Sequence, residues 1–211
     1  MKRVINLDNW NRKEHFKFFS ALDDPFWGIT TTVDFTSVYQ QSKNMEVSFF
    51  LYSVYFLLKC INATTAFKLR IENGDVVEYD KINISPTIGR EDGTFGFGFF
   101  EYDTDLSLFI ENAEKEIHRV KNSAGLSFSK DTARADVIRY SALPWFAFSE
   151  MKHAGSIQTG DSIPKISTGK LIQEKKKLLL PISISVHHGL VDGRNIAEFI
   201  QNLKDGQNNT L

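Results

Sequence analysis

The stretch from Ser183 to Gly193 contains the side chains best suited to catalysis or binding, because two adjacent histidines are followed after three residues by Asp-Gly. An imidazole titrates near neutrality, so it can accept a proton from a hydroxyl group. The apolar run from Leu178 to Val186 predicts a buried strand that ends at this pair. A helix is expected to follow, with apolar residues spaced for one face: Ile196, Phe199, Ile200 and Leu203. The pattern predicts a histidine held by packing at the mouth of a strand and open to a ligand.

Two other interpretations of the histidine pair stay open on spacing alone. Asp-Gly is common in turns, so the pair could be a polar surface turn. The histidines could also bind a metal ion together with Asp192 and His153. Adjacent residues of a strand point to opposite faces, however, so both histidines seldom bind one ion. With one cysteine and no second paired-histidine motif, we expect no metal site.

Composition favours a soluble globular protein. A chain of 211 residues with 42% hydrophobic residues can bury one core, so we expect a single domain over 1–211. The net charge of −1 predicts no attraction to nucleic acid or to a membrane surface. The lone Cys60 excludes an internal disulfide bond and is expected to be an inert core residue. The most apolar run, 49–58, is too short to span a bilayer, and no secretory leader is visible, so we expect a cytoplasmic location.

Helices and strands that would position the histidine alternate irregularly along the chain. Apolar spacing predicts helices at 11–19, 36–43, 48–62 and 106–117, besides the one after Gly193. Strands are predicted at 3–7, 27–35, 67–72, 76–79, 137–140, 145–148 and 163–171, with Asn73-Gly74 closing a hairpin. The lysines 175–177 would form a solvated hairpin turn. This order predicts a mixed sheet covered on one side by helices.

The motif His187-His188-Gly189-Leu190-Val191-Asp192-Gly193 resembles the His-His-x-x-x-Asp-Gly active-site motif of the chloramphenicol acetyltransferases. Other segments agree in the family's order. The stretch 9–16 is similar to the amino-terminal Trp-x-Arg-x-x-x-Phe stretch, 67–80 resembles the central hairpin, and 141–145 resembles the Ser-x-x-Pro-Trp segment. Thr168-Gly169-Lys170 matches a Gly-Lys step before the last strand. The resemblance covers essentially the whole chain.

This resemblance implies a fold, an assembly and a reaction. The fold would be the α/β two-layer sandwich of coenzyme-A-dependent acyltransferases, with a mixed β-sheet covered by helices. The assembly would be a homotrimer with its active sites at subunit interfaces. The reaction would be transfer of an acetyl group from acetyl-CoA, a co-substrate and not a permanently bound cofactor, to a hydroxyl of chloramphenicol. The alternatives are the same chemistry on another, more polar hydroxyl acceptor, and a non-catalytic small-molecule binder. The presence of His188 and Ser141 argues against the binder.

The resemblance also assigns roles to individual residues. His188 would be the general base, and Ser141 would donate to the oxyanion of the tetrahedral intermediate. Asp192 would pair with Arg12 and hold the turn that presents the histidine, rather than act in a triad; a bidentate bond suits such a pair. Lys170 and Trp145 would contact coenzyme A. The first histidine, His187, would point away from the reaction and serve in packing.

The acceptor pocket is where the sequence departs from the family. Five positions align with pocket positions: Phe19, Asp23, Arg139, Asp161 and Ser167. Phe19 stands where family members often carry tyrosine, and Ser167 where they tend to carry threonine. The three charged residues stand where apolar or neutral side chains are usual. Unpaired charges facing an apolar ring are costly, so these positions predict weaker binding of chloramphenicol.

Overall fold

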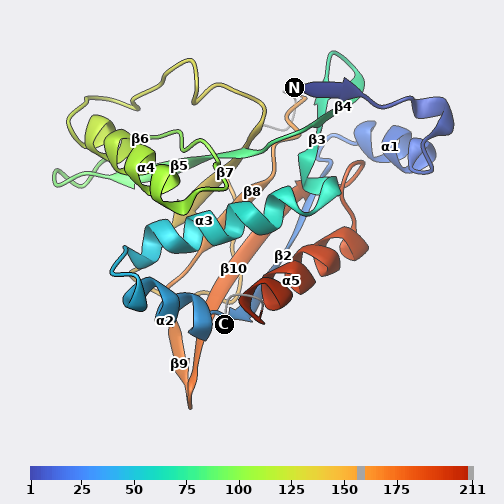
Figure 1. Ribbon diagram of the computed structural model, residues 1–211. Helices are drawn as coiled ribbons and strands as arrows, with labels where there is room; N and C mark the ends of the chain where they lie inside the picture. The colour runs from blue at the N-terminus through green and yellow to red at the C-terminus, as the bar shows by residue number, and fades with distance from the viewer. Residues whose placement is uncertain (156–159, 209–211) are drawn as a thin grey trace.

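The computed structural model describes residues 1–155 and 160–208 and has two layers, a twisted sheet and a layer of helices (Figure 1). The seven-stranded sheet has the order β2-β10-β8-β7-β5-β6, and β9 pairs with the outer part of β10. Its strands are β2 (Phe26–Asp34), β5 (Asn83–Gly89), β6 (Phe95–Phe97), β7 (Val137–Ala142), β8 (Lys165–Thr168), β9 (Ile172–Glu174) and β10 (Lys177–His187). Strands β5, β7 and β8 run parallel, whereas β10 is antiparallel to both β8 and β2. The predicted mixed sheet is confirmed.

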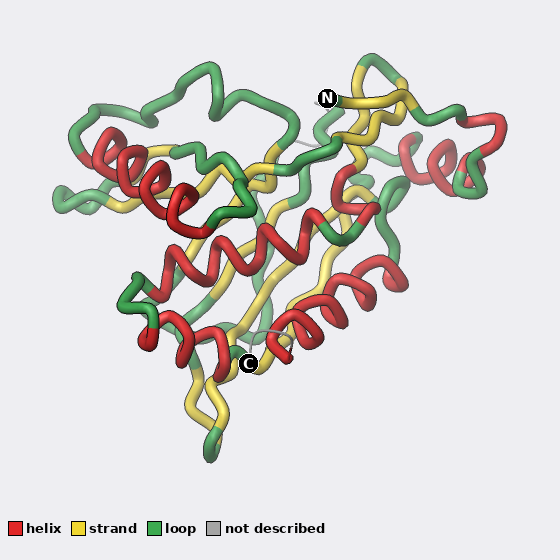
Figure 2. Tube along the Cα trace, viewed as in Figure 1, coloured by secondary structure: helices red, strands yellow, loops and turns green. Residues whose placement is uncertain are grey.

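Helices pack on one face of this sheet, as Figure 2 shows in red against yellow. They are α2 (Thr36–Asn44), α3 (Phe49–Asn62), α4 (Leu106–Lys121) and α5 (Gly193–Asn208), whereas α1 (Lys13–Ser20) lies to one side of this layer (Figure 1). A smaller sheet, in the order β1-β4-β3, joins β1 (Lys2–Val4), β3 (Leu69–Glu72) and β4 (Asp75–Tyr79). Short 3₁₀ turns occupy Leu7–Asn9 and Thr65–Lys68.

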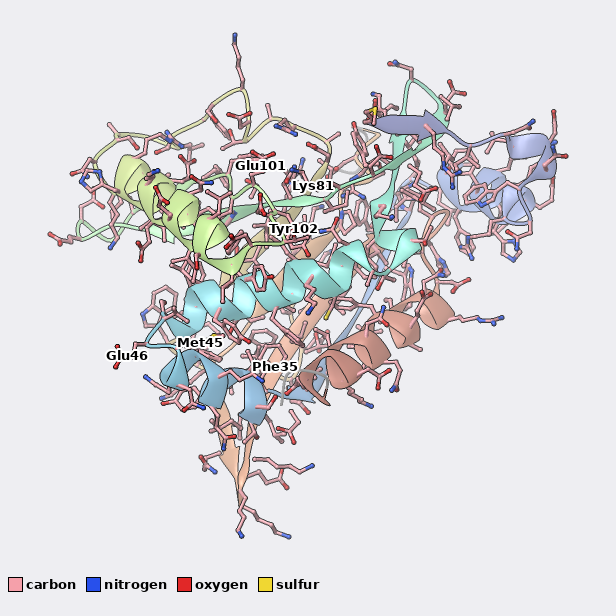
Figure 3. All side chains as sticks on the ribbon, in the orientation of Figure 1. Phe35, Met45, Glu46, Lys81, Glu101 and Tyr102 are labelled. Carbon is pink, nitrogen blue, oxygen red and sulfur yellow. The ribbon has the colours of Figure 1, made fainter. Side chains whose placement is uncertain are left out.

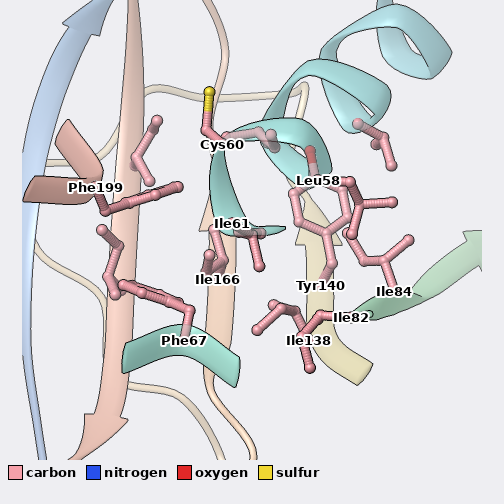
Figure 4. Packing of buried hydrophobic residues seen from close by; sticks show 14 of the residues in the cluster. Leu58, Cys60, Ile61, Phe67, Ile82, Ile84, Ile138, Tyr140, Ile166 and Phe199 are labelled. Atoms are coloured by element: carbon pink, nitrogen blue, oxygen red, sulfur yellow. The ribbon is translucent and has the colours of Figure 1, made fainter. Parts of the chain in front are cut away.

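The core lies between α3 and the large sheet. Helix α3 is apolar nearly all round, and Leu57, Leu58 and Ile61 are at most 1% exposed. On the sheet, alternate residues of neighbouring strands face this helix (Figure 4). Those labelled are Ile82 and Ile84 before and in β5, Ile138 and Tyr140 in β7, and Ile166 in β8. Because side chains alternate along a strand, the same strands must present their other residues to the opposite face.

Side chains divide between this core and the surface as their polarity requires (Figure 3). Phe35 is fully buried between β2 and α2, and the apolar Met45, which is exposed at the end of α2, is an exception. Lys81 and Glu101 form an ion pair of 2.7 Å at the surface, where such pairs contribute little to stability.

The face without helices carries two polar rows that cross the sheet. In the first, Thr30, Ser183, Ser167 and Ser141 are paired from β2 through β10 and β8 to β7. Thr87 of β5 continues this row by donating a hydrogen bond to the Ser141 hydroxyl, with 3.2 Å between the oxygens. The second row is equally continuous: Gly28, Ser185, Lys165 and Arg139. The open face is therefore lined by hydroxyl groups and cations, the chemistry of a binding surface rather than of a core.

Several elements differ from expectation, and the short strands β6 and β9 were not predicted. The strand predicted at 145–148 is wrong, since Pro144 and Trp145 form a turn and Trp145 is 74% exposed. Pro144 lacks the N–H that a strand would need there. Strand β5 was not predicted, because Pro86 in its middle argues against a central strand. Its neighbours tolerate the missing donor, and the Pro86 carbonyl still accepts from Gly98 N at 2.9 Å. The other predicted elements are present within a few residues.

Arg70 on β3 ties the two sheets together. Its side chain is fully buried and donates to four main-chain carbonyls, those of Phe67, Leu69, Ala135 and Val137, at 2.6–2.9 Å. Burial lowers the pKa of the guanidinium to about 10, which still leaves it charged at neutral pH. Val137 is the first residue of β7 and Ala135 lies just before it, so this one side chain fixes the hairpin against the large sheet.

We expect Arg70→Met to lower the free energy of unfolding by about 3–5 kcal/mol, because four buried carbonyls lose their donors. Urea denaturation of the purified protein measures this loss. The matched control is Arg3→Met, which breaks an ion pair with Glu78 while the arginine side chain is 72% exposed, and should change stability by less than about 1 kcal/mol. Equal effects of the two substitutions would refute this role of Arg70.

Candidate active site

His188 is the first residue after β10, and the surrounding main chain fixes its backbone. Its N–H donates to the carbonyl of Pro25 at 2.8 Å, which anchors it to the start of β2. The following turn closes on the carbonyl of His187, which accepts from the N–H groups of Leu190 and Val191 at 3.0 Å each. Leu190 and Val191 are buried, so the turn cannot move without exposing apolar surface.

Two aromatic side chains hold the His188 ring. Phe19 of α1 stacks on it, with 3.8 Å between ring centroids and 16° between planes. Trp27 of β2 lies 5.0 Å away, and its indole N–H donates to the Val191 carbonyl at 3.0 Å. Within the described chain, Nδ1 of His188 is buried and has no hydrogen-bond partner. The nitrogen left open to a ligand is Nε2, which makes it the candidate proton acceptor.

Arg12 and Asp192 form an ion pair across the turn that follows His188, as the resemblance implied. Arg12 Nη1 contacts Asp192 Oδ2, and Arg12 Nη2 donates to the His188 carbonyl at 3.3 Å. The guanidinium is thus divided between the two ends of the turn, and the expected bidentate bond to the carboxylate is not formed. The second carboxylate oxygen, Oδ1, accepts from the N–H groups of Arg194 and Asn195 and caps α5. Burial raises the pKa of Asp192, but Arg12 and these N–H groups lower it further, so the net pKa lies below its ordinary value.

His187 faces the polar side of the sheet and is 3% exposed. Its Nδ1 accepts a hydrogen bond from Gly189 N at 3.2 Å, and its ring meets Phe26 edge-on at 5.9 Å. Burial lowers the pKa of this imidazole to about 4, so it is neutral in the folded protein. These contacts are those of a packing residue.

Ser141 lies on the same polar face, but far from His188 of the same chain. It pairs with Ser167, which pairs with Ser183, four residues before His187 and two strands away from β7. From the usual strand spacing and rise, the Cα atoms of Ser141 and His188 are about 19 Å apart. The Ser141 oxygen accepts from Thr87, so its own proton remains free to be donated. Within one chain, these two residues cannot act on the same carbonyl group.

A cleft of about 870 Å³ opens on this polar face. Its floor comes from β2, β8 and β10, and the segment 149–155 forms its far wall. Two hydrogen bonds hold that wall on the sheet. His153 Nε2 lies 3.0 Å from Ser167 Oγ, and Ser183 Oγ donates to the Met151 carbonyl at 3.4 Å. Burial, followed by the charge of Lys165, lowers the pKa of His153.

The predicted pocket residues lie in different surroundings. Phe19 covers His188. Ser167 is fully buried next to His153 and does not line the cleft. Asp23 is exposed in the turn after α1, and the carboxylate at the cleft is its neighbour Asp24. Arg139 and Asp161 pair with each other at 2.7 Å beside the cleft, so neither charge is isolated.

Lys170 and Trp145 come together at the edge beyond Ser141. The Lys170 N–H donates to the Phe146 carbonyl at 2.9 Å, and Leu143 N donates to the Thr168 carbonyl at 2.8 Å. Both Lys170 and Trp145 are exposed, as residues that contact a large co-substrate would be.

Three residues around the site were not singled out from the sequence, Trp27, Thr87 and Lys165, and His153 was considered only as a metal ligand. A signal existed for Lys165, because Ile163, Lys165, Ser167 and Gly169 alternate with Pro164, Ile166 and Thr168, which predicts a polar face. Trp27 and Thr87 belong to strands, and nothing in their immediate sequence indicates contact with the site.

Neither a metal centre nor a membrane span is found in the described part of the chain. No group of three or more His, Cys, Asp or Glu side chains is arranged to bind a metal among residues 1–155 and 160–208. No helix in those ranges is long and apolar enough to cross a bilayer.

Comparison with known proteins agrees with this geometry. The family model described as chloramphenicol acetyltransferase matches residues 2–204. The chain is 27% identical over 208 residues to chloramphenicol acetyltransferase 3 of Escherichia coli, with 98% of this chain and 97% of the relative covered. It is 28% identical over 205 residues to a chloramphenicol acetyltransferase of Clostridioides difficile, covering 95% and 93%.

Solved structures show the same architecture. A chloramphenicol acetyltransferase structure superposes with a TM-score of 0.89 at 30% identity, covering 97% of this chain and 99% of the other. A dihydrolipoamide acetyltransferase of Azotobacter vinelandii, at 14% identity and a TM-score of 0.69, covers 92% and 85% and shares the fold.

A helix-covered mixed sheet with a histidine at the end of an interior strand, together with these matches, identifies an acyltransferase. The chain belongs to the chloramphenicol acetyltransferase family.

Arg12 and Asp192 should act as one structural unit. We expect Arg12→Met and Asp192→Asn each to lower both the free energy of unfolding and kcat, with a coupling energy of about 1–3 kcal/mol in a double-mutant cycle. The neighbouring exposed pair Lys13 and Asp8, 2.6 Å apart, is the control, and Lys13→Met with Asp8→Asn should couple by less than about 1 kcal/mol. Additive effects of the two substitutions would show that Arg12 and Asp192 do not act as one structural unit.

His187 should make folding sensitive to acid. The unfolded imidazole binds a proton as the pH falls through about 6.5, whereas the folded one resists until about 4. The unfolded state therefore binds more protons in this window, and we expect the free energy of unfolding to fall by roughly 1–2 kcal/mol from pH 7 to pH 5. His187→Gln should flatten this part of the curve, while His15→Gln, at an exposed histidine, should not. Identical slopes for the two variants would contradict the assignment.

Proposed function

We propose that this protein transfers the acetyl group of acetyl-CoA to a hydroxyl of chloramphenicol, with His188 as general base. The observation that carries the proposal is the fixed His188 ring, with Nδ1 buried and Nε2 open at the end of β10. A proton acceptor held by packing, by main-chain hydrogen bonds and by Arg12 suits a reaction that begins with deprotonation of a hydroxyl. A cytoplasmic location is part of the same proposal.

The chemistry needs three events at one carbonyl group. Nε2 of His188 accepts the hydroxyl proton while the acceptor oxygen attacks the thioester carbon. Ser141 donates its free proton in a hydrogen bond to the oxyanion of the tetrahedral intermediate, a contribution of about 3 kcal/mol for a well-placed donor. The intermediate then collapses, the C–S bond breaks, and the imidazolium returns its proton to the leaving thiolate of coenzyme A. No other cofactor is required by these steps.

The separation of Ser141 and His188 supports a homotrimer with its sites between subunits. Residues about 19 Å apart cannot serve one carbonyl, so a second copy would supply the missing partner. In this arrangement, the His188 of one subunit faces the polar sheet surface of the next. Closed rotational symmetry would repeat the same contact at every interface. Trp145 and Lys170, exposed beyond Ser141, would bind acetyl-CoA.

A second acceptor class is favoured by the charges beside the cleft. Lys165 lines it, and Arg139 and Asp161 stand next to Lys165 as an ion-paired group. An apolar ring placed against them offers no replacement for water. A hydroxyl compound more polar than chloramphenicol is therefore the alternative substrate of the same reaction. A non-catalytic binder would not need the free Nε2 of His188 and is the less supported candidate.

Subunit mixing tests the base, the oxyanion donor and the composite site together. His188→Ala should lower kcat by a factor of about 10²–10⁴, and Ser141→Ala by about 10²–10³, with folding retained. Unfolded separately, mixed in equal amounts and refolded, the two inactive variants should recover about a quarter of wild-type activity, because random assembly puts an intact His188 opposite an intact Ser141 at that frequency.

The controls are each variant refolded alone and His188→Ala mixed with His188→Gln, which share the defective side of the site. Neither control should recover activity. Absence of recovery in the Ser141 and His188 mixture would refute the shared site. A stable, active His188→Ala protein would overturn the choice of base.

A further inference from the structure

Lys165 is the charged group set deepest in the cleft wall. It occupies the first position of β8, in the polar row between Ser185 and Arg139, and it is 7% exposed. Its Nζ lies beside two other lining residues. It is 4.3 Å from the ring centroid of Phe26, and a Cβ built on Gly155 would come within 2.8 Å of it. The ammonium therefore sits at the cleft, in a space that a side chain at position 155 would fill.

The hydrogen-bonding capacity of this ammonium is unused within the described chain. Its nearest carboxylate oxygen, Asp161 Oδ2, is 3.5 Å away, which is an ion pair without a close hydrogen bond. The same oxygen is held more tightly by Arg139, at 2.7 Å, and Asp161 Oδ1 accepts from Ile163 N. Two cations thus share one carboxylate. An ammonium has three donors, and burying it without acceptors is unfavourable.

The remaining charges of the cleft lie at its rim. Asp24, Glu150 and Lys152 line it and are exposed, so water and salt screen them. His153, on the wall, is held by Ser167 and has its pKa lowered by burial and by Lys165. The buried end of the cleft therefore has an excess of one positive charge.

We propose that Lys165 binds a carboxylate of the acceptor, so that the preferred substrate is a hydroxylated carboxylic acid rather than a neutral alcohol. The inference rests on the proposed acetyl transfer and names the acceptor class. A carboxylate would supply the missing acceptors for Nζ and neutralise the excess charge, and charge-assisted hydrogen bonds of this kind are among the stronger ones. The aromatic ring of Phe26 gives the rest of the acceptor an apolar contact.

The test compares aromatic and aliphatic hydroxy acids with their methyl esters, using release of coenzyme A thiol from acetyl-CoA as the measure. We expect wild-type kcat/KM to favour the acids over their esters by about tenfold or more. Lys165→Met should lower kcat/KM for the acids by about 10–100-fold and should not lower it for the neutral esters or for chloramphenicol. The KM for acetyl-CoA should not change. Lys121→Met, at an exposed lysine near the end of α4, is the matched control and should behave as wild type.

Binding measured without turnover separates this inference from the proposed function. Phenylpropionate, a carboxylate without the hydroxyl, should bind wild-type protein in calorimetry and bind Lys165→Met about tenfold more weakly or worse. Should Lys165→Met fail to fold, competitive inhibition of chloramphenicol turnover by phenylpropionate, but not by its methyl ester, gives the same answer on wild-type protein. Esters turned over as well as acids, or a change confined to the KM for acetyl-CoA, would overturn the role of Lys165 while leaving acetyl transfer intact. Binding of phenylpropionate without turnover of any alcohol would instead refute the acetyltransferase.

Discussion

The geometry of the candidate site depends on one guanidinium, that of Arg12. The turn from His188 to Asp192 brings the His188 carbonyl oxygen and the Asp192 carboxylate toward the same point. The carbonyl oxygen carries a partial negative charge and the carboxylate a full one. Without a cation between them they would repel each other and the turn would open. Arg12 contacts both, while Asp192 also caps α5. Arg12 therefore links α1, the turn after His188 and the start of α5, while Phe19 and Trp27 hold the ring itself.

The rest of the architecture follows from the alternation of side chains along β10. Ile182, Ile184 and Val186 face the helices and are fully buried, while Ser183 and Ser185 face the polar surface. One strand thus belongs both to the core and to the binding surface. A strand that packs against helices on one face is more rigid than a loop. The His188 ring, at the end of such a strand, is therefore held in a well-defined position. Strands β2, β7 and β8 likewise place residues of the two polar rows on the face opposite the helices.

Much of this could be predicted from the sequence, and the exceptions have physical reasons. The histidine motif and the Asn73-Gly74 hairpin are local patterns, and both residues of that turn adopt positive φ in the structure. Trp145 was placed in a strand because its neighbours are aromatic, but no partner strand is available in the described chain to pair with it.

Long-range neighbours set the remainder. Lys165 is buried because Phe26 and Asp161 surround it, and neither is adjacent in sequence. Asp23 and Asp24 are chemically alike, and which of them reaches the cleft depends on one peptide unit. Strand β5 contains Pro86, a residue that is unusual in a central strand, and it still pairs in parallel with β7.

The place of β10 in the sheet has a consequence for how the chain is made. It lies between β2 and β8, yet it is synthesised after both, and more than 140 residues separate it from its partners in β2. A nascent chain therefore exposes the unpaired edges of β2 and β8 until almost the whole protein has emerged. Contacts so distant in sequence close slowly, since the loop entropy must be overcome before the pairing stabilises anything. Unpaired strand edges are also what aggregating chains share with one another. Because β10, the strand that presents the histidine, is synthesised late, the nascent chain is exposed to aggregation until β10 pairs with β2 and β8.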